Sequence, residues 1–244
     1  MFVQNRLGLI ESVETMRAQE ERMNQIANNL ANVDTIGYKR ENLTFWEMLH
    51  RTESQRMRVG KGIKLLTDFQ QGAAQLTGNP LNVMLDGKGF FKVQTPAGIR
   101  YTRAGDFSLN GTGQLVTKEG YQVLGEGGTI VVDGSDLIFD RKGGVLVDGQ
   151  RIDQLQVVDF ADPTVLEKEG DNLFRLRQNA TGGEIAPEDG VQVIQGSLEQ
   201  SNANVTFELT EMIDLQRNYQ AQQKLVQAID DIDGQAVNQV GKLS

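Results

Sequence analysis

The chain has 244 residues, a net charge of −9 and no cysteine. The acidic balance argues against a nucleic-acid-binding protein, because phosphate binding needs a concentrated basic surface. The lack of cysteine excludes disulfides, thiolate metal sites and cysteine nucleophiles. The amino-terminal stretch becomes polar too early for the apolar core of a signal peptide, and no run approaches the roughly 18 apolar residues of a membrane span. By these rules alone, we expect a cytoplasmic protein.

An apolar stripe at the N-terminus predicts a helix that packs along another helix. Every seventh residue of this stretch is apolar: Phe2, Leu9, Met16, Met23 and Leu30. Val13 and Ala27 fit the second position of the same seam, whereas Glu20 breaks it. We expect the helix to end near Asn32, since Gly37 just beyond it supplies turn chemistry.

A longer stripe predicts a second helix at the C-terminus. Its seam positions follow alternating steps of three and four, and most are apolar: Met212, Leu215, Tyr219, Val226, Ile229, Ala236, Val240 and Leu243. Gln222 and Asp233 occupy the two remaining seam positions and weaken the stripe. Three residues suit the N-cap, namely Ser201, Asn202 and Asn204, and Glu208 and Glu211 lie near the positive end of the helix dipole. From Val205 to Lys242 the helix would be about 55 Å long at 1.5 Å per residue, which is too long for a helix folded around a compact domain of this size. The two stripes are therefore expected to pack on each other or on neighbouring copies.

The middle of the chain predicts strands. Short β-prone segments separated by glycine-containing turns recur every 8–12 residues or so, which is typical of an antiparallel sandwich or a barrel-like domain. These segments are residues 89–95, 101–110, 113–117, 121–125, 129–134, 137–149, 155–160, 173–178 and 191–200. The segment 137–149 has the form of a hairpin across Lys142-Gly143-Gly144. The predicted fold class is α+β, in this order: an N-terminal helix (1–33), an extended connector (34–80), a central β domain (81–200) and a C-terminal helix (201–244).

A search for catalytic chemistry finds no site. The single histidine, His50, is the one residue that could serve a Ser-His-Asp triad, and neither a G-x-S-x-G elbow nor a phosphate-binding loop is present. Three aspartates near the C-terminus would diverge around a helix and could not converge on a metal. Asp133 and Asp136 lack the spacing of a calcium loop and are read as a turn. We therefore predict no catalytic, cofactor-binding or metal-binding residue.

The segment from Ile26 to Arg40 closely resembles the signature of the flagellar rod and hook family. That signature is A-N-N-L-A-N followed by T-x-G-[FY]-[KR], and the matching residues are Ala27, Asn28, Asn29, Leu30, Ala31, Asn32, Thr35, Gly37, Tyr38 and Lys39. Side chains of asparagine can satisfy a fraying helix end, and glycine makes the turn. Two more blocks, residues 80–107 and 201–219, resemble the family's central β motif and C-terminal helix motif. Ala203 departs from the pattern, where a larger apolar residue is expected.

The resemblance implies a structural subunit that assembles helically, through its terminal helices, into the hollow rod of the flagellar basal body. It also implies export through the flagellum's own type III channel without a cleaved signal, which replaces the cytoplasmic expectation with the periplasm-spanning basal body. The implied partners are copies of the chain, other rod subunits, the export apparatus and possible ring proteins, with no cofactor, nucleic acid or membrane insertion. The short connector favours the proximal-rod branch, the F subunit.

The residues expected at subunit interfaces combine both stripes and the signature: Leu9, Val13, Met16, Met23, Ala27, Asn28, Asn29, Leu30, Asn32, Gly37, Met212, Leu215, Tyr219, Val226, Ile229, Ala236 and Val240. We expect the isolated termini to be partly disordered and to fold on assembly, because neighbours supply the buried area. A distal-rod or hook subunit of the same family is one alternative. A secreted β-rich binding module or hydrolase is another, and it would show full helix content as a monomer.

Overall fold

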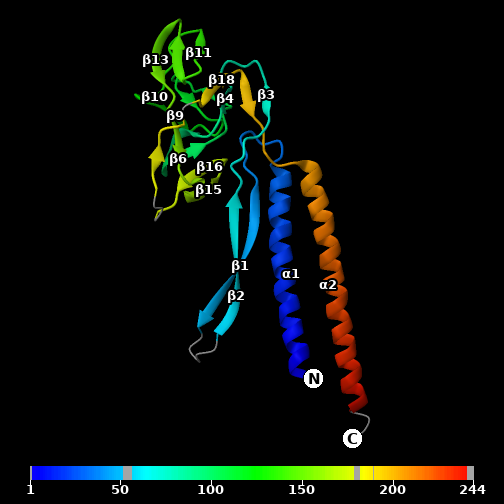
Figure 1. Cartoon of the computed structure of the whole chain (residues 1–244). Helices are drawn as coiled ribbons and strands as arrows, with labels where there is room; N and C mark the ends of the chain where they lie inside the picture. Colours follow the sequence, from blue (N-terminus) through cyan, green and yellow to red (C-terminus); the bar gives the residue numbers. More distant parts are fainter. Residues whose placement is uncertain (1, 52–56, 179–181, 189, 241–244) are drawn as a thin grey trace. The chain divides into compact units, whose positions relative to one another are not determined.

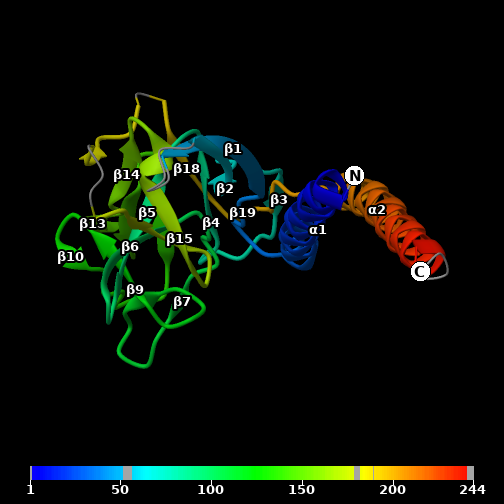
Figure 2. The same cartoon turned by 90° about the horizontal axis from the view of Figure 1, so that it is seen from below.

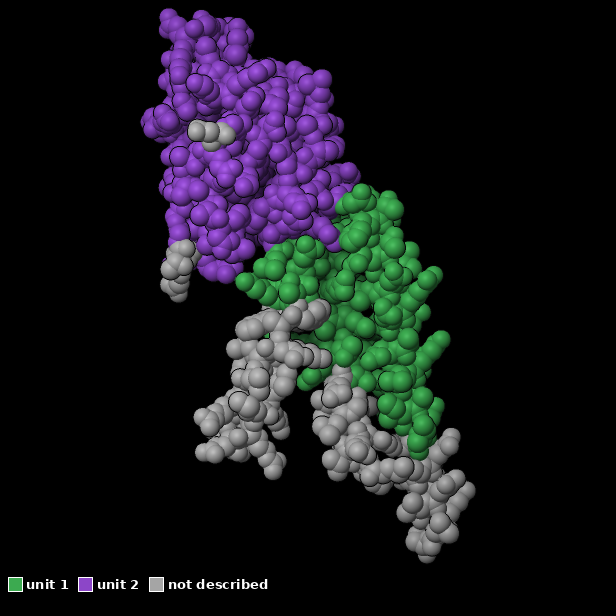
Figure 3. Space-filling model, viewed as in Figure 1, with its two compact units in different colours: residues 1–31, 41–66, 204–244 green, residues 32–40, 67–203 purple. Residues whose placement is uncertain are grey.

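A computed structural model describes residues 2–51, 57–178, 182–188 and 190–240. The chain divides into two compact units, which Figure 3 shows in green and purple. We call residues 1–31, 41–66 and 204–244 the helical unit, and residues 32–40 and 67–203 the β unit. The chain therefore passes between the two units four times, and each unit is built from segments far apart in sequence.

The helical unit contains two long helices, α1 (Phe2–Ala31) and α2 (Val205–Val240), which lie side by side (Figures 1 and 2). The backbone N–H of Phe207 donates to the Asn204 side-chain oxygen over 3.1 Å, so Asn204 is the one of the three candidate residues that caps α2. The end of α1 at Ala31 and the start of α2 at Val205 confirm the expected helices. In the described part of the chain, no helix is long and apolar enough to cross a membrane.

The helical unit also contains a two-stranded sheet formed by β1 (Glu41–Arg51) and β2 (Met57–Thr67). These strands lie within residues 34–80, which the sequence analysis expected as an extended connector. Over these residues the chain is extended and paired into a sheet, and β1 contacts α1.

The β unit is made of short antiparallel strands and one 3₁₀ turn. In chain order they are β3 (Ala74–Leu76), β4 (Val83–Asp86), β5 (Phe90–Thr95), β6 (Gly98–Thr102), β7 (Ser108–Leu109), β8 (Leu115–Val116), β9 (Gln122–Gly125), β10 (Gly128–Thr129), β11 (Leu137–Phe139), β12 (Gly144–Val147), β13 (Gln150–Gln154), β14 (Val157–Phe160), η1 (Pro163–Val165), β15 (Leu166–Gly170), β16 (Leu173–Leu176), β17 (Glu184–Ile185), β18 (Gln192–Gln195) and β19 (Ser197–Glu199).

The largest sheet runs in the order β15-β16-β6-β5-β9-β8-β7, with β14 also paired to β5. Three smaller sheets join β11-β12-β13, β4 with β18, and β3 with β19. The predicted hairpin is confirmed: β11 and β12 are antiparallel, and the Gly143 N–H donates to Asp140 O over 3.0 Å in the turn. Two helices flanking an antiparallel β-rich domain confirm the α+β class.

Strand β5 separates two hydrophobic clusters, because successive side chains of a strand point to opposite faces. Phe91 is fully buried in the larger cluster, with its ring 5.1 Å from that of Phe107. Its neighbour Phe90 lies in the smaller cluster, in edge contact with Phe160 and Phe174. The central sheet is therefore covered on both faces.

Candidate functional site

The predicted seam residues of α2 recur on one face of the helix, and those that the structure describes are buried or half-buried. Leu215 is 8% exposed, and the other seam positions at 212, 219, 226 and 229 are half-buried. Arg22 of α1 pairs with Glu211 of α2 over 2.6 Å, so this side of α2 faces α1 within the same chain. Burial thus indicates that the α2 seam holds the helix pair together.

The seam of α1 is less regular. Met16, Met23 and Leu30 are half-buried, whereas Ala27 and Asn28 are exposed. Val13, with 54% of its surface exposed, also faces away from the covered side. The side chains of Leu9, Ala236 and Val240 lie outside those that the structure describes.

A buried polar contact lies inside the helical unit. The Asn29 side chain donates to Glu41 O and accepts from Glu41 N, both over 3.0 Å, and its amide nitrogen is 3.3 Å from Glu208 Oε1. Asn29 and Glu208 are both fully buried. Asn29 therefore connects the end of α1 to the start of β1 and to α2, which is a stronger role than the helix-end cap expected from sequence.

Large apolar side chains of α2 remain exposed on the sides that do not meet α1. Their exposed fractions lie between 42% and 61%, and they are Val205, Phe207, Leu209, Ile213, Leu225 and Ile232. These residues are not among the predicted interface residues, because they fall outside the heptad seam. The available signal was that α2 carries more apolar residues than one seam requires.

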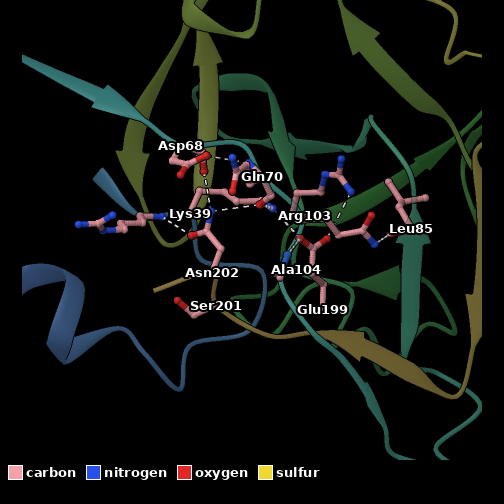
Figure 4. A network of polar contacts seen from close by, with 12 residues as sticks. Lys39, Asp68, Gln70, Leu85, Arg103, Ala104, Glu199, Ser201 and Asn202 are labelled. Carbon is pink, nitrogen blue, oxygen red and sulfur yellow. Dashed lines mark hydrogen bonds and ion pairs between the residues drawn. The ribbon is translucent and has the colours of Figure 1, made fainter. Parts of the chain in front are cut away.

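A second cluster lies in the β unit around the fully buried carboxylate of Glu199. Lys39 Nζ donates to Glu199 Oε1 over 2.5 Å, and Arg103 approaches Glu199 Oε2 to 3.3 Å (Figure 4). The Gly72 N–H also donates to Glu199 Oε1, over 3.0 Å. Lys39 donates as well to Gln70 O, over 2.7 Å. The carboxylate thus joins four separate stretches of the β unit.

Backbone and amide hydrogen bonds extend this cluster. Asn202 accepts from Arg40 N over 2.6 Å and donates to Asp68 O over 2.8 Å. The Gly37 N–H donates to Glu199 O over 2.7 Å. We call residues 37–40, 68–72 and 199–202, together with Arg103, the junction. Gly37 was predicted as an interface residue, but it is buried inside the β unit at this junction.

The electrostatics of the junction follow from burial. Desolvation lowers the pKa of Lys39 below its usual value, and the adjacent Glu199 carboxylate opposes that shift. Burial likewise lowers the pKa of Arg103, again opposed by Glu199. One carboxylate therefore compensates two buried cations. For this reason we expect substitution of Glu199 to destabilise the cluster more than substitution of either cation.

A second ion pair of the β unit provides a pH test. Burial alone would raise the pKa of Glu184, but hydrogen bonds from Lys92 Nζ over 2.8 Å and Tyr101 OH over 2.6 Å outweigh it and lower the pKa. A carboxylate with a lowered folded pKa stabilises the fold above its unfolded pKa of about 4.3 and loses that contribution as pH falls through the folded value. The contribution is about 1 kcal/mol, since solvent screens this partly exposed pair.

We therefore expect Glu184→Gln to flatten the loss of stability that the wild type shows as the pH falls below the ordinary carboxyl pKa of about 4.3. Urea unfolding followed by circular dichroism at several pH values would measure this. The control is Glu188→Gln, whose exposed partner Lys88 lies 3.5 Å away. An acid profile of Glu184→Gln that matches the wild type would contradict the assignment.

No metal-binding group is found among the residues that the structure describes, since no three His, Cys, Asp or Glu side chains are suitably placed there. The His50 side chain lies outside the described ones. Asp133 and Asp136 are exposed, and the Asp136 N–H donates to Asp148 Oδ1 over 3.1 Å, as expected of a turn. The candidate functional features among the described residues are therefore the helix surfaces and the junction.

Three family profiles match successive parts of the chain. Residues 12–39 match "Flagella basal body rod protein", residues 84–150 match "Flagellar hook protein FlgE/F/G D1 domain", and residues 194–239 match "Flagellar basal body rod FlgEFG protein C-terminal". Each matched range contributes one charged group of the junction, namely Lys39, Arg103 and Glu199 in that order.

Curated relatives match nearly the whole chain. The flagellar basal-body rod protein FlgG of Bacillus subtilis (strain 168) is 34% identical over 262 positions, covering 95% of this chain and 98% of the relative. In Caulobacter vibrioides, FlgG is 33% identical over 245 positions (89% of this chain, 93% of the relative), and FlgF is 33% identical over 231 positions (90% and 91%).

The two Caulobacter alignments differ in the number of positions at which this chain has a gap. The FlgG alignment includes about 217 of the 244 residues, so about 28 of its 245 positions lack a counterpart in this chain. The FlgF alignment includes about 220 residues in 231 positions, which leaves about 11 without a counterpart.

Proposed function

The chain belongs to the family of flagellar basal-body rod and hook proteins, and on that premise we propose that its paired terminal helices are the surface through which subunits assemble. It is a non-enzymatic structural subunit of the basal-body rod, and membership of the family implies assembly with other rod subunits. The proposal concerns which residues carry that assembly and which part of the rod the chain builds.

The proposal rests on the apolar residues of α2 that its own chain leaves exposed. Leu209 and Ile213 are four residues apart and therefore share one side of the helix, while Leu225 and Ile232 share another. Burying such side chains against a neighbour is favourable by about 25 cal/mol per Å². An interface between different faces of identical subunits that does not close produces a helical filament.

We assign two roles to the predicted interface residues. The half-buried seam, with Met23, Met212, Leu215, Tyr219 and Val226 among its members, holds α1 and α2 as a pair. The outward residues meet neighbouring subunits. They include the predicted Val13, Ala27 and Asn28 as well as the exposed apolar residues of α2.

Ile213→Glu tests this assignment. Ile213 is 50% exposed, so the substitution should change the stability of the isolated protein by no more than about 0.5 kcal/mol. It should nevertheless abolish swimming and the incorporation of the subunit into isolated basal bodies, because a charge would be buried at the interface.

The matched control is Gln220→Glu, which adds the same charge at an exposed polar position of α2. We expect this variant to assemble. If Ile213→Glu assembles like the wild type, the outward face is not the interface, and if it unfolds the isolated protein, the residue is structural.

We further propose that the chain is a proximal-rod subunit of the F type. The alignment with FlgF of Caulobacter needs fewer gap positions in this chain than the alignment with FlgG, about 11 against about 28. The short connector, residues 34–80, supports the same assignment. Deleting the gene for a proximal subunit should remove the distal-rod protein from isolated basal bodies as well, whereas deleting a distal subunit should leave the proximal rod in place.

A further inference from the structure

The chain passes between the two units at four points, and at each of them the β-unit side leads into the junction. The chain leaves α1 and reaches Gly37, enters β1 after Arg40, returns from β2 at Asp68, and enters α2 after Asn202. The Asp68 N–H donates to Arg40 O over 2.8 Å, and the Asn202 N–H to Tyr38 O over 3.4 Å. The ends that lead to the helical unit are therefore hydrogen-bonded to one another inside the β unit.

Buried ion pairs at the centre of the junction connect the segments in addition to these backbone hydrogen bonds. The Lys39 and Glu199 side chains are fully buried, and Arg103 is 4% exposed. Arg103 also donates to Gly87 O over 2.8 Å, which fixes the cluster to the turn before β5. Withdrawing Lys39, Arg103 or Glu199 would leave a buried charge without its partner. Withdrawing residues 68–72 would remove two hydrogen bonds from these charges, so the segments should separate together or not at all.

We propose that Lys39, Arg103 and Glu199 are positioning residues that hold together the four segments of the β unit from which the chain passes to the helical unit. We call this ion network, with the segments that it joins, the anchor, and we infer that it opens cooperatively. A pull on either terminal helix is then resisted by the whole ion network rather than by a single strand. This role in the rod rests on the assignment of the chain as a rod subunit, whereas the anchor itself is a property of the isolated protein.

Hydrogen exchange on the purified full-length chain tests the anchor. Lys39→Met keeps the Glu199–Arg103 contact and should therefore remain folded. In this variant we expect the amides of Gly37, Asp68 and Gly72 all to exchange at least about a hundredfold faster than in the wild type. The reason is that opening any of these segments then breaks a smaller ion network and costs less free energy.

Lys92→Met is the matched control. It removes the cation of the Lys92–Glu184 pair, which lies in the same unit but joins no crossing. The anchor is contradicted if the junction amides speed up no more in Lys39→Met than in Lys92→Met, or if one segment speeds up without the others.

Swimming in media of increasing viscosity tests the role in the rod. Cells carrying Lys39→Met should build flagella in normal number but stop swimming at a lower viscosity than cells carrying Lys92→Met. Fast exchange combined with an unchanged viscosity response would overturn the mechanical role while leaving the anchor in place. A lack of flagella in both strains would instead identify a defect of folding or export and overturn the specific role of Lys39.

Discussion

Replacing Glu199 with glutamine is expected to lower the free energy of unfolding of the β unit by about 3–5 kcal/mol. The glutamine keeps the size of the side chain but removes the only carboxylate that contacts both Lys39 and Arg103 in the junction. Two buried cations would then remain without their shared anion. Lys39→Met should cost less, because Glu199 retains Arg103 and the Gly72 N–H.

Urea unfolding followed by circular dichroism would measure both variants. The control is Glu167→Gln, which breaks the Glu167–Arg175 pair of 2.8 Å, whose side chains are 44% and 43% exposed. Such a surface pair contributes less than about 1 kcal/mol. A loss for Glu199→Gln no larger than that of Glu167→Gln would show that the buried network contributes little to stability.

Replacing Gly37 with alanine should be at least as damaging, with a loss above about 4 kcal/mol. Gly37 has a φ of +66°, and a Cβ there would lie 2.4 Å from Ala104 N and 2.6 Å from Arg103 C. Both atoms belong to the backbone and cannot move aside as a flexible side chain would. The turn that follows α1 therefore has to be rebuilt, along with the hydrogen bond from Gly37 to Glu199.

Gly78→Ala separates the cost of the left-handed backbone conformation from the cost of the steric clash. Gly78 has a similar φ of +71°, but a Cβ there meets no atom within 4 Å. Its cost should be only the conformational penalty of about 1–2 kcal/mol. Thermal unfolding of the two variants side by side gives the comparison, and equal losses would mean that backbone conformation, and not close packing at the junction, makes Gly37 necessary.

Local patterns were sufficient to predict the helices and most strands. Heptad spacing with cap and turn residues predicted the end of α1 near Asn32 and the start of α2 at Val205, and the structure has Ala31 and Val205. The predicted end of α2 at Lys242 lies outside the described residues. Alternation with turn residues located β5, β9, β12, β16 and β18. Strand β15, Leu166–Gly170, was missed because four of its five residues are charged or glycine. Strand β4 follows Pro80 closely and offered only four residues of signal.

The junction could not be predicted, because its members are distant in sequence. Lys39 and Glu199 are 160 residues apart, and no local rule indicates that a lysine and a glutamate are fully buried. The resemblance identified Lys39 and Arg103 as parts of motifs but not as partners. The outward apolar face of α2 was missed for another reason, since a heptad seam describes one face of a helix only. The expected disorder of the isolated termini stays a prediction.

The two phenylalanines at the start of β5 have a consequence for how this protein can change over time. Phe90 and Phe91 belong to different clusters, so the two layers of the β unit share this strand and few other elements. A substitution in one layer needs compensation mainly within that layer, and the two outer surfaces can therefore diverge at different rates. A shift of β5 by one residue would exchange both layers at once and insert Lys92 where Phe91 lies. We therefore expect β5 to tolerate fewer substitutions than strands that contribute to one cluster only.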